Sequence, residues 1–242
     1  RANIVVASEK GVSVPVDAND ANIKTEVIGR PLPGVFSVDT DKKVRFSPGN
    51  LYVKKDDSEN WNWHFYDEQY ACNSLNSHCD KETASRDQRT TDYEIDEIDL
   101  FGWGDVEKPD GTGNKYAKGH ATDGETFDKN EDWGFIFGGE SSVWRTLTAH
   151  EWEYLFNYGD YTSDVRNGKY KCGVTVCDYP NCVVLLPDNW KWKEGDNWQT
   201  EYDEEDWSSM EAAGAVCLPA AGYDAGTSIK SVGRAGFYWT SS

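Results

Sequence analysis

One stretch decides how we expect the chain to fold: Trp144-Arg145-Thr146-Leu147-Thr148-Ala149-His150-Glu151-Trp152-Glu153-Tyr154-Leu155-Phe156. Thr148 and Glu151 are three residues apart, which is the spacing of a capping box, so a short helix is predicted to begin there. Trp152, Leu155 and Phe156 follow at i, i+3 and i+4, which puts three large apolar side chains on one face. A face this apolar must pack against another part of the chain.

The second half of the chain supplies apolar partners for this helix. Val183-Val184-Leu185-Leu186-Pro187 and Ala215-Val216-Cys217-Leu218-Pro219 have the composition of short buried strands that end at proline. Between them, Asp203 is placed to cap a second helix that carries Trp207, Met210 and Ala213 and ends at Gly214. We therefore predict an α+β domain with two short helices, small antiparallel sheets and long loops.

The first part of the chain indicates hairpins. Residues 1–34 are interpreted as an N-terminal β arm or hairpin appendage, and its run Val12–Val16 contains Pro15, which favours an edge strand. Residues 35–242 form the main domain, which opens with a hairpin over 35–47 and strands at 51–53 and 61–65. From 67 to 132 no period holds, so long loops are expected.

Composition excludes several classes of protein. The 24 Lys and Arg residues against 43 Asp and Glu residues give a net charge of -19, which repels nucleic acid and anionic membrane surfaces. The 11 Trp, 13 Tyr and 9 Phe residues argue for a packed core rather than an acidic disordered chain. No apolar run reaches the length of a membrane-spanning helix, so membrane insertion is not expected.

The six cysteines predict disulfides and an oxidising compartment. They are Cys72, Cys79, Cys172, Cys177, Cys182 and Cys217, an even number without the paired Cys and His spacing of a zinc site. Cys72 with Cys79 closes the shortest local loop. The sequence leaves the other pairings open.

Two kinds of binding site are candidates. Asp128, Asn130 and Asp132 present oxygen atoms at alternating positions, as a calcium loop does, whereas the alternative is a solvated acidic turn. Four rings crowd a polar stretch and are predicted to bind a ligand: Trp190, Trp192, Trp198 and Tyr202. The alternative is that these rings pin a long loop to the core. No catalytic pattern emerges, because His150 in the first turn of a helix is more often a solvent-facing residue than a general base.

Several longer motifs carry a resemblance to a known group of proteins. They are Lys43-Val44-Arg45-Phe46-Ser47-Pro48-Gly49-Asn50-Leu51, Ile98-Asp99-Leu100-Phe101-Gly102-Trp103-Gly104, Trp144-Arg145-Thr146-Leu147-Thr148 with Glu151-Trp152, Leu185-Leu186-Pro187-Asp188, Met210-Glu211-Ala212-Ala213-Gly214-Ala215-Val216 through Leu218-Pro219-Ala220-Ala221-Gly222-Tyr223, and Gly236-Phe237-Tyr238-Trp239-Thr240-Ser241-Ser242. Over residues 35–242 the chain resembles secreted and surface proteins of Bacteroidetes-type bacteria, similar to the Fibrobacter major paralogous domain. It is also similar to the C-type-lectin-like, formylglycine-generating-enzyme-like fold, which serves as the display scaffold of the variable proteins of diversity-generating retroelements.

The resemblance implies an extracellular or cell-surface protein that binds a glycan or a protein ligand through loops, without catalysis. Members of the group continue past the Tyr-Trp-Ser-Ser-like segment into further strands, so the domain is expected to be truncated at Ser242 or completed by a neighbouring chain. The alternative function is a structural subunit of an extracellular filament or pilus, assembled by strand exchange through the N-terminal arm.

Overall fold

In the computed structural model, the described residues are 6–8, 31–57, 61–74, 77–78, 97–98, 132, 134, 143–224 and 229–241. Small sheets and short helices make up these parts, so the fold is of the mixed α+β kind. A central sheet has the strand order β12-β10-β11-β13, built from Glu201–Tyr202, Tyr170–Val176, Tyr179–Leu185 and Val216–Leu218. A second sheet has the order β2-β3-β1-β9, built from Phe36–Ser37, Lys43–Phe46, Val6–Ser8 and Arg145–Thr146.

Smaller sheets surround these two. One joins β5 (Trp61–Phe65), β4 (Leu51–Lys55) and β8 (Glu97–Ile98). Two further pairs are β6 (Asn73–Ser74) with β7 (Ser77–His78), and β14 (Tyr223–Asp224) with β15 (Ile229–Lys230). The predicted hairpin over 35–47 is β2–β3, and the predicted strands at 51–53 and 61–65 are β4 and β5, paired antiparallel.

The predicted capping box is present. Helix α2 spans Ala149–Leu155, and the Thr148 side chain accepts a hydrogen bond from the Glu151 N–H while the Glu151 carboxylate accepts one from the Thr148 N–H. Arg145 adds two hydrogen bonds of 2.7 Å to the same carboxylate. The helix therefore begins at a fixed point beside β9.

The second predicted helix, α3, spans Glu204–Ala212. Asp203 caps its N-terminus through the Asp206 N–H. At its other end Gly214, with φ +96°, and Ala215 bond back to the carbonyls of Glu211 and Met210, the pattern of a Schellman motif. Ala213 was predicted within this helix, but it follows the last helical residue and is exposed.

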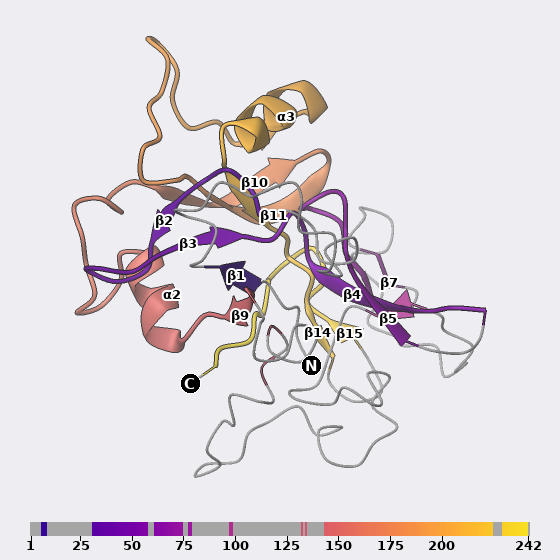
Figure 1. Cartoon of the computed structure of the whole chain (residues 1–242). Helices are drawn as coiled ribbons and strands as arrows, with labels where there is room; N and C mark the ends of the chain where they lie inside the picture. The colour runs from indigo at the N-terminus through magenta and orange to yellow at the C-terminus, as the bar shows by residue number, and fades with distance from the viewer. Residues whose placement is uncertain are drawn as a thin grey trace, which may run out of the picture.

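The central sheet is covered on both faces, as Figure 1 shows, with α3 above β10 and β11 and with α2, β2 and β3 below. Successive side chains of a strand point to opposite faces. Leu185, Val216 and Leu218 therefore join the cluster that contains Trp152 and Leu155 of α2. Cys182, Val184 and Cys217 join the opposite cluster under α3, with Trp207 and Met210. This alternation explains why the two runs 183–187 and 215–219 are apolar on both faces.

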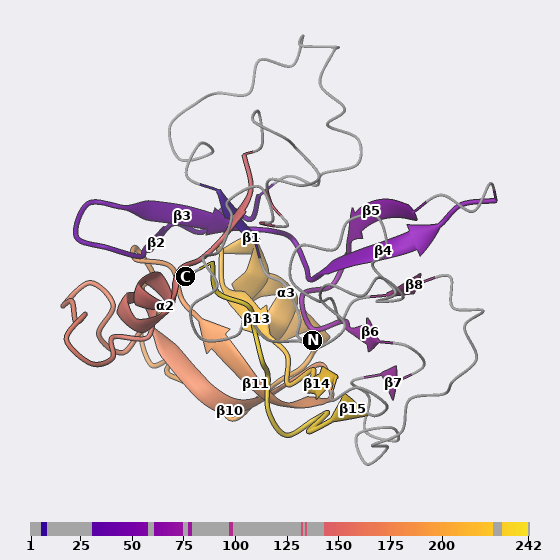
Figure 2. The same cartoon turned by 90° about the horizontal axis from the view of Figure 1, so that it is seen from below.

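The N-terminal segment contributes to the second sheet. β1 pairs with β3 on one side and with β9 on the other, so Val6–Ser8 lies inside the sheet of the main domain. The run Val12–Val16, and with it the predicted hairpin of the arm, lies outside the described residues. Most of the predicted loop region 67–132 also lies outside them, but its described parts contain the two-residue strands β6, β7 and β8, which the prediction of loops did not include. Figure 2, viewed from below, shows β1 alongside β3.

Candidate functional site

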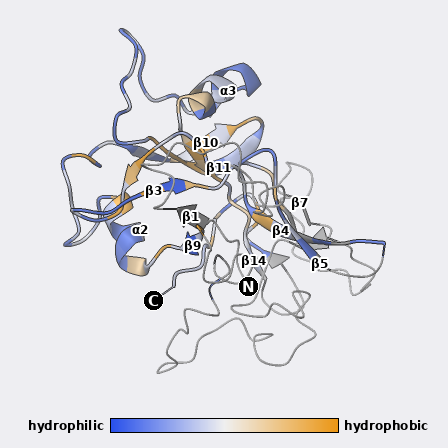
Figure 3. Cartoon of the chain, in the orientation of Figure 1, coloured by the Kyte–Doolittle hydropathy of each residue, from blue (hydrophilic) through white to orange (hydrophobic). Residues whose placement is uncertain are grey.

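The candidate site is formed by one long loop and by α3. The chain leaves β11 at Leu185 and returns to the central sheet at β12, which runs parallel to β10. We name residues 189–199, which carry three tryptophans, the Trp loop. Figure 3 shows that this loop, which projects beside α3, is coloured mainly as hydrophilic. A loop of this composition needs specific anchors.

Asp188 anchors the start of the Trp loop. Its backbone N–H donates to Val35 O at 2.9 Å, and its carboxylate accepts hydrogen bonds from the Ser37 N–H at 2.9 Å and the Ser37 hydroxyl at 2.7 Å. Arg166 Nη1 reaches the same carboxylate at 3.2 Å and Lys43 Nζ approaches it at 3.6 Å. The Asp188 side chain therefore makes its contacts inside the fold, where it connects β2 to the end of β11.

Arg166 is fully buried behind this carboxylate. Its Nε donates to Leu155 O at 3.2 Å and its Nη1 to Leu186 O at 2.9 Å, and the guanidinium lies over the Phe36 ring. Burial lowers the pKa of Arg166, while the charge and hydrogen bond of Asp188 act in the opposite direction. The buried cation thus ties the C-terminal end of α2 to the base of the loop.

Two further hydrogen bonds hold the Trp loop against the turn before β10. Lys169 Nζ donates to Trp190 O at 2.8 Å, and Trp198 Nε1 donates to Gly168 O at 3.3 Å. Trp192 lies between the other two tryptophans, with ring centroids 5.4 Å from Trp190 and 5.4 Å from Trp198, both in edge-to-face geometry. The three rings are half-buried and pack partly against the core under α3. They therefore pin the loop, as the alternative interpretation of the sequence had it, while parts of the rings stay accessible.

Tyr202 was predicted as a ring for ligand binding, yet it belongs to the core. Its side chain is only 2% exposed, because β12 places it beneath α3. Its hydroxyl accepts a hydrogen bond of 3.0 Å from the Gln199 N–H. Burial raises the pKa of this phenol, and the Gln199 N–H acts to lower it. Tyr202 thus fixes the end of the Trp loop and forms part of the pocket floor.

A pocket of about 690 Å³ lies between the Trp loop and α3. Its size falls within the range of small-molecule sites, about 300–1,000 Å³. The lining residues are Asn189, Trp190, Lys191, Trp192, Lys193, Gly195, Asp196, Asn197, Gln199, Tyr202, Asp206, Ser209, Met210 and Ala213. Trp190, Trp192 and Tyr202 of the predicted ligand-binding set line this pocket, and Trp198 supports it from behind through Trp192.

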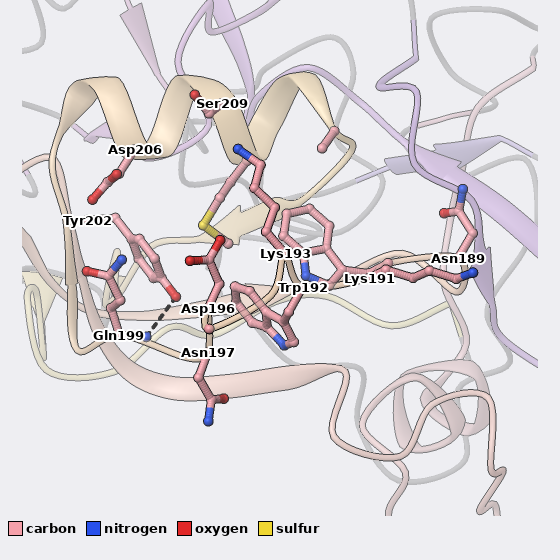
Figure 4. Close-up of a pocket in the computed structure, with 14 residues that line it drawn as sticks. Asn189, Lys191, Trp192, Lys193, Asp196, Asn197, Gln199, Tyr202, Asp206 and Ser209 are labelled. Carbon is pink, nitrogen blue, oxygen red and sulfur yellow. Dashed lines mark hydrogen bonds between the residues drawn. The ribbon is translucent and has the colours of Figure 1, made fainter.

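The interior of the pocket combines a ring with groups of opposite charge. Figure 4 shows Lys193 and Asp196 of the loop turned toward Tyr202 and the helix, whereas Lys191 and Asn197 point away. Asp206 and Ser209 of α3 also line the pocket. The pocket therefore offers an aromatic surface, an ammonium, carboxylates and a hydroxyl within one concave site.

The α3 side of the pocket was missed in the sequence. Asp206, Ser209 and Ala213 recur at helical spacing and are all exposed, so together they form a stripe of short side chains along α3. That stripe is the signal that could have identified the second wall.

The calcium site predicted at Asp128, Asn130 and Asp132 falls mainly on residues outside the described parts of the chain. Asp132 is described, and it is buried. Both of its oxygens accept hydrogen bonds from Thr146, and Oδ1 accepts a further one from the Gly134 N–H. Through these hydrogen bonds the Asp132 carboxylate connects Gly134 to β9. The calcium prediction therefore depends on Asp128 and Asn130, which lie outside the described residues. Within the described ranges, no cluster of three or more His, Cys, Asp or Glu side chains could hold a metal ion.

The cysteines differ from the prediction. Cys72 is in a disulfide, and its predicted partner Cys79 lies outside the described residues. Cys172, Cys177, Cys182 and Cys217 are free thiols. Cys182 and Cys217 are buried on the α3 face of the central sheet, so they fill space in an apolar core. Burial, and then contact with the Cys182 thiol, raises the pKa of Cys217.

Among the described helices, none is long and apolar enough to cross a membrane. The chain matches no known protein family, no curated protein and no solved structure. Conclusions about function therefore depend on the geometry of the site.

Proposed function

We propose that this chain is an extracellular, cell-surface binding protein that holds a glycan in the pocket between the Trp loop and α3, without catalysis. The observation that carries the proposal is Trp192, a ring fixed edge-to-face between two other tryptophans at the wall of a pocket lined by carboxylate, ammonium, amide and hydroxyl groups.

Carbohydrates match this combination of groups. A sugar ring has an apolar C–H face that packs on an aromatic ring, and it has hydroxyls that both donate and accept hydrogen bonds. Asp196 and Asp206 can accept from hydroxyls, while Lys193 donates to them. Because Trp192 and Tyr202 are already held by their neighbours, little side-chain freedom is lost when a ligand binds.

The same proposal includes the type of fold and the cellular location of the protein. The motifs quoted above support a C-type-lectin-like domain of a secreted or surface protein, and the disulfide at Cys72 supports an oxidising compartment. A protein ligand is the second class that a loop surface of this kind accepts, and the experiment below separates the two classes.

The test is binding of the full chain to a panel of glycans and to a panel of surface proteins. Trp192→Ala should lower the affinity for the selected glycan at least about fivefold, since an aromatic contact in a concave site is worth about 1 kcal/mol or more. Tyr158→Ala is the matched control, because Tyr158 is 68% exposed and lies outside the pocket. It should leave the affinity unchanged.

Three results would count against the proposal. Binding to proteins alone would replace the glycan by a protein ligand, and equal loss in both variants would place the site elsewhere. Cleavage of the bound glycan would contradict the absence of catalysis.

Each assay is run with calcium and with chelator, because an ion held at Asp128 and Asn130 would make the melting temperature depend on calcium.

A further inference from the structure

The position of β1 suggests how one copy of this chain can join another. β1 is a three-residue strand, yet it lies in the interior of its sheet, between β3 and β9. Ala7 pairs with Phe46 on one side and with Arg145 on the other, and Ser8 pairs with Arg45. All the pairing between β3 and β9 in this sheet is therefore made through β1.

Removal of β1 would open a slot of defined width. β3 is paired on its other edge with β2, and Phe46 O accepts a hydrogen bond from the Leu32 N–H, so loss of β1 would leave the backbone of Arg45 without its strand partner. Arg145 of β9 would lose its strand partner in the same way, whereas the Thr146 N–H donates to Asp132. Unpaired backbone groups at a strand edge are a template for another strand, so some segment must fill this slot.

The strand that fills the slot is connected to the domain by a long stretch of chain. Residues 9–30 separate Ser8 from Pro31, and an extended segment of that length spans on the order of 70 Å. Such a length is enough to reach the slot of a neighbouring molecule as well as its own. The contacts made in the two arrangements are the same, so the balance between them is set by concentration.

We propose that Val6–Ser8 of one copy occupies the slot between β3 and β9 of a second copy, so that copies of this chain are joined by strand exchange. This interaction is independent of the ligand bound at the Trp loop. It assigns the exchanged strand to Val6–Ser8, whereas the sequence suggested Val12–Val16, which lies outside the described residues.

Charge opposes this association in dilute salt. Each copy carries a net charge of -19, so two copies repel each other within a Debye length of about 10 Å at 0.1 M salt. Exchange should therefore increase with both salt and protein concentration. Because residues 9–30 join this strand to its own domain, the strand is present near its own slot at an effective concentration in the millimolar range, so the exchanged form is a minority at micromolar protein.

The experiment places one cysteine on the exchanged strand of one molecule and a second cysteine on the slot of another molecule. One chain carries Ser8→Cys and the other carries Arg45→Cys, both in a Cys172→Ser background that removes the exposed native thiol. The two chains are refolded together at 0.5 M salt and oxidised with glutathione disulfide, which takes up the two electrons released when the new bond forms. Ser8→Cys mixed with Ser208→Cys is the matched control, because Ser208 is exposed on α3.

Strand exchange predicts a disulfide-linked species at twice the monomer mass of 27.3 kDa in the Ser8→Cys and Arg45→Cys mixture, at least fivefold above the control. Its ratio to monomer should rise roughly tenfold for each tenfold increase in protein concentration while it remains the minor form. A yield no greater than the control would overturn the proposal.

A chain that carries both substitutions checks the register. At low concentration it should form the same bond within one molecule, and at high concentration it should form linked dimers or a ladder of multimers. A ladder would indicate an open filament, and dimers alone would indicate reciprocal exchange; both support strand exchange. Failure to form the bond under any condition would show that Ser8 does not face Arg45, which also overturns the proposal.

Discussion

At the scale of single residues, Asp188 connects most of the parts that hold the binding site. Its carboxylate joins Ser37 of β2 to the buried Arg166, and its backbone N–H reaches Val35. A buried guanidinium without its counter-ion costs several kcal/mol. The candidate site therefore depends on a charge pair that lies at the base of the Trp loop and does not line the pocket.

Asp188→Asn should lower the free energy of unfolding by about 3 kcal/mol, because it leaves the Arg166 charge buried without its carboxylate. Denaturant titration of both proteins measures the change. Asp160→Asn provides the control, since Asp160 is exposed and should change stability by less than about 0.5 kcal/mol. A similar small change at Asp188 would mean that the pair contributes little.

Glu151 should make stability depend on pH. Burial acts to raise its pKa, but the hydrogen bonds from Arg145 and the Thr148 N–H outweigh burial, so the pKa of Glu151 lies below its ordinary 4.5. As pH falls through this range the unfolded chain binds the proton first, so this contribution is present above about pH 5 and is lost at lower pH.

Comparison of wild type with Glu151→Gln isolates this effect. The difference in unfolding free energy between the two proteins should be largest at neutral pH and should shrink as the pH falls from about 5 toward 3. Circular dichroism during urea titration at each pH measures it. A difference that stays constant with pH would exclude the assigned role of the Arg145–Glu151 pair.

Residue-scale features were predictable only where the partners are close in sequence. The Thr148–Glu151 capping box needs two residues three apart, and it was identified from spacing alone. Gln69 was missed, although it is buried, donates to Glu211 and Ala215 O, and accepts from the Cys217 N–H. These partners lie more than 140 residues away, and no local pattern marks such a contact.

At the scale of elements, the C-terminal end of α3 is set by contact between two glycines. Gly214 has φ +96°, and a Cβ there would lie 2.5 Å from Gly34 Cα and 2.6 Å from Gly34 N. Backbone atoms cannot move aside as a flexible side chain can. The sequence predicted Gly214 as a left-handed cap, but the close approach of the segment before β2 emerges only from the fold.

Gly214→Ala should therefore destabilise the protein by at least about 2 kcal/mol, through strain at positive φ together with the clash against Gly34. Gly159→Ala separates the two causes. Gly159 has φ +65° and open space around its Cβ position, so only the conformational cost of about 1 kcal/mol is expected. Thermal unfolding of both variants is the measurement, and equal effects would show that the contact with Gly34 is unimportant.

Strands and loops differ in how far the sequence predicts them. The apolar runs of β11 and β13 were identified because both faces of each strand are buried, against α2 on one side and α3 on the other. The Trp loop was identified as aromatic, but Tyr202 was placed at the surface because its burial depends on the pairing of β12 with β10. Strand pairing across distant segments has no local signature.

At the scale of the whole molecule, the redox state is the point on which sequence and structure differ most. The even number of cysteines predicted that all six are oxidised, whereas Cys172, Cys177, Cys182 and Cys217 are free in the structure. Cys172 is exposed, while Cys182 and Cys217 are buried beneath α3. The more exposed cysteines should therefore react faster with a thiol reagent than the buried ones.

Alkylation without reductant should label Cys172 in the folded protein, and should label Cys182 and Cys217 only after unfolding, because burial excludes the reagent and raises the pKa of Cys217. Mass spectrometry of digested protein identifies the labelled positions. If no cysteine is labelled even in denaturant, all six cysteines are paired in disulfides. The prediction from the sequence would then be correct, and the four cysteines would not be free thiols.

A ligand bound between the Trp loop and α3 should protect these two elements from solvent. Hydrogen–deuterium exchange of the full chain, with and without the glycan selected by the panel, tests the location directly. We expect slower exchange in residues 189–199 and in α3, and unchanged exchange in β14 and β15. If exchange in 189–199 and α3 is unchanged and protection is found on another face of the molecule, the ligand does not bind in this pocket.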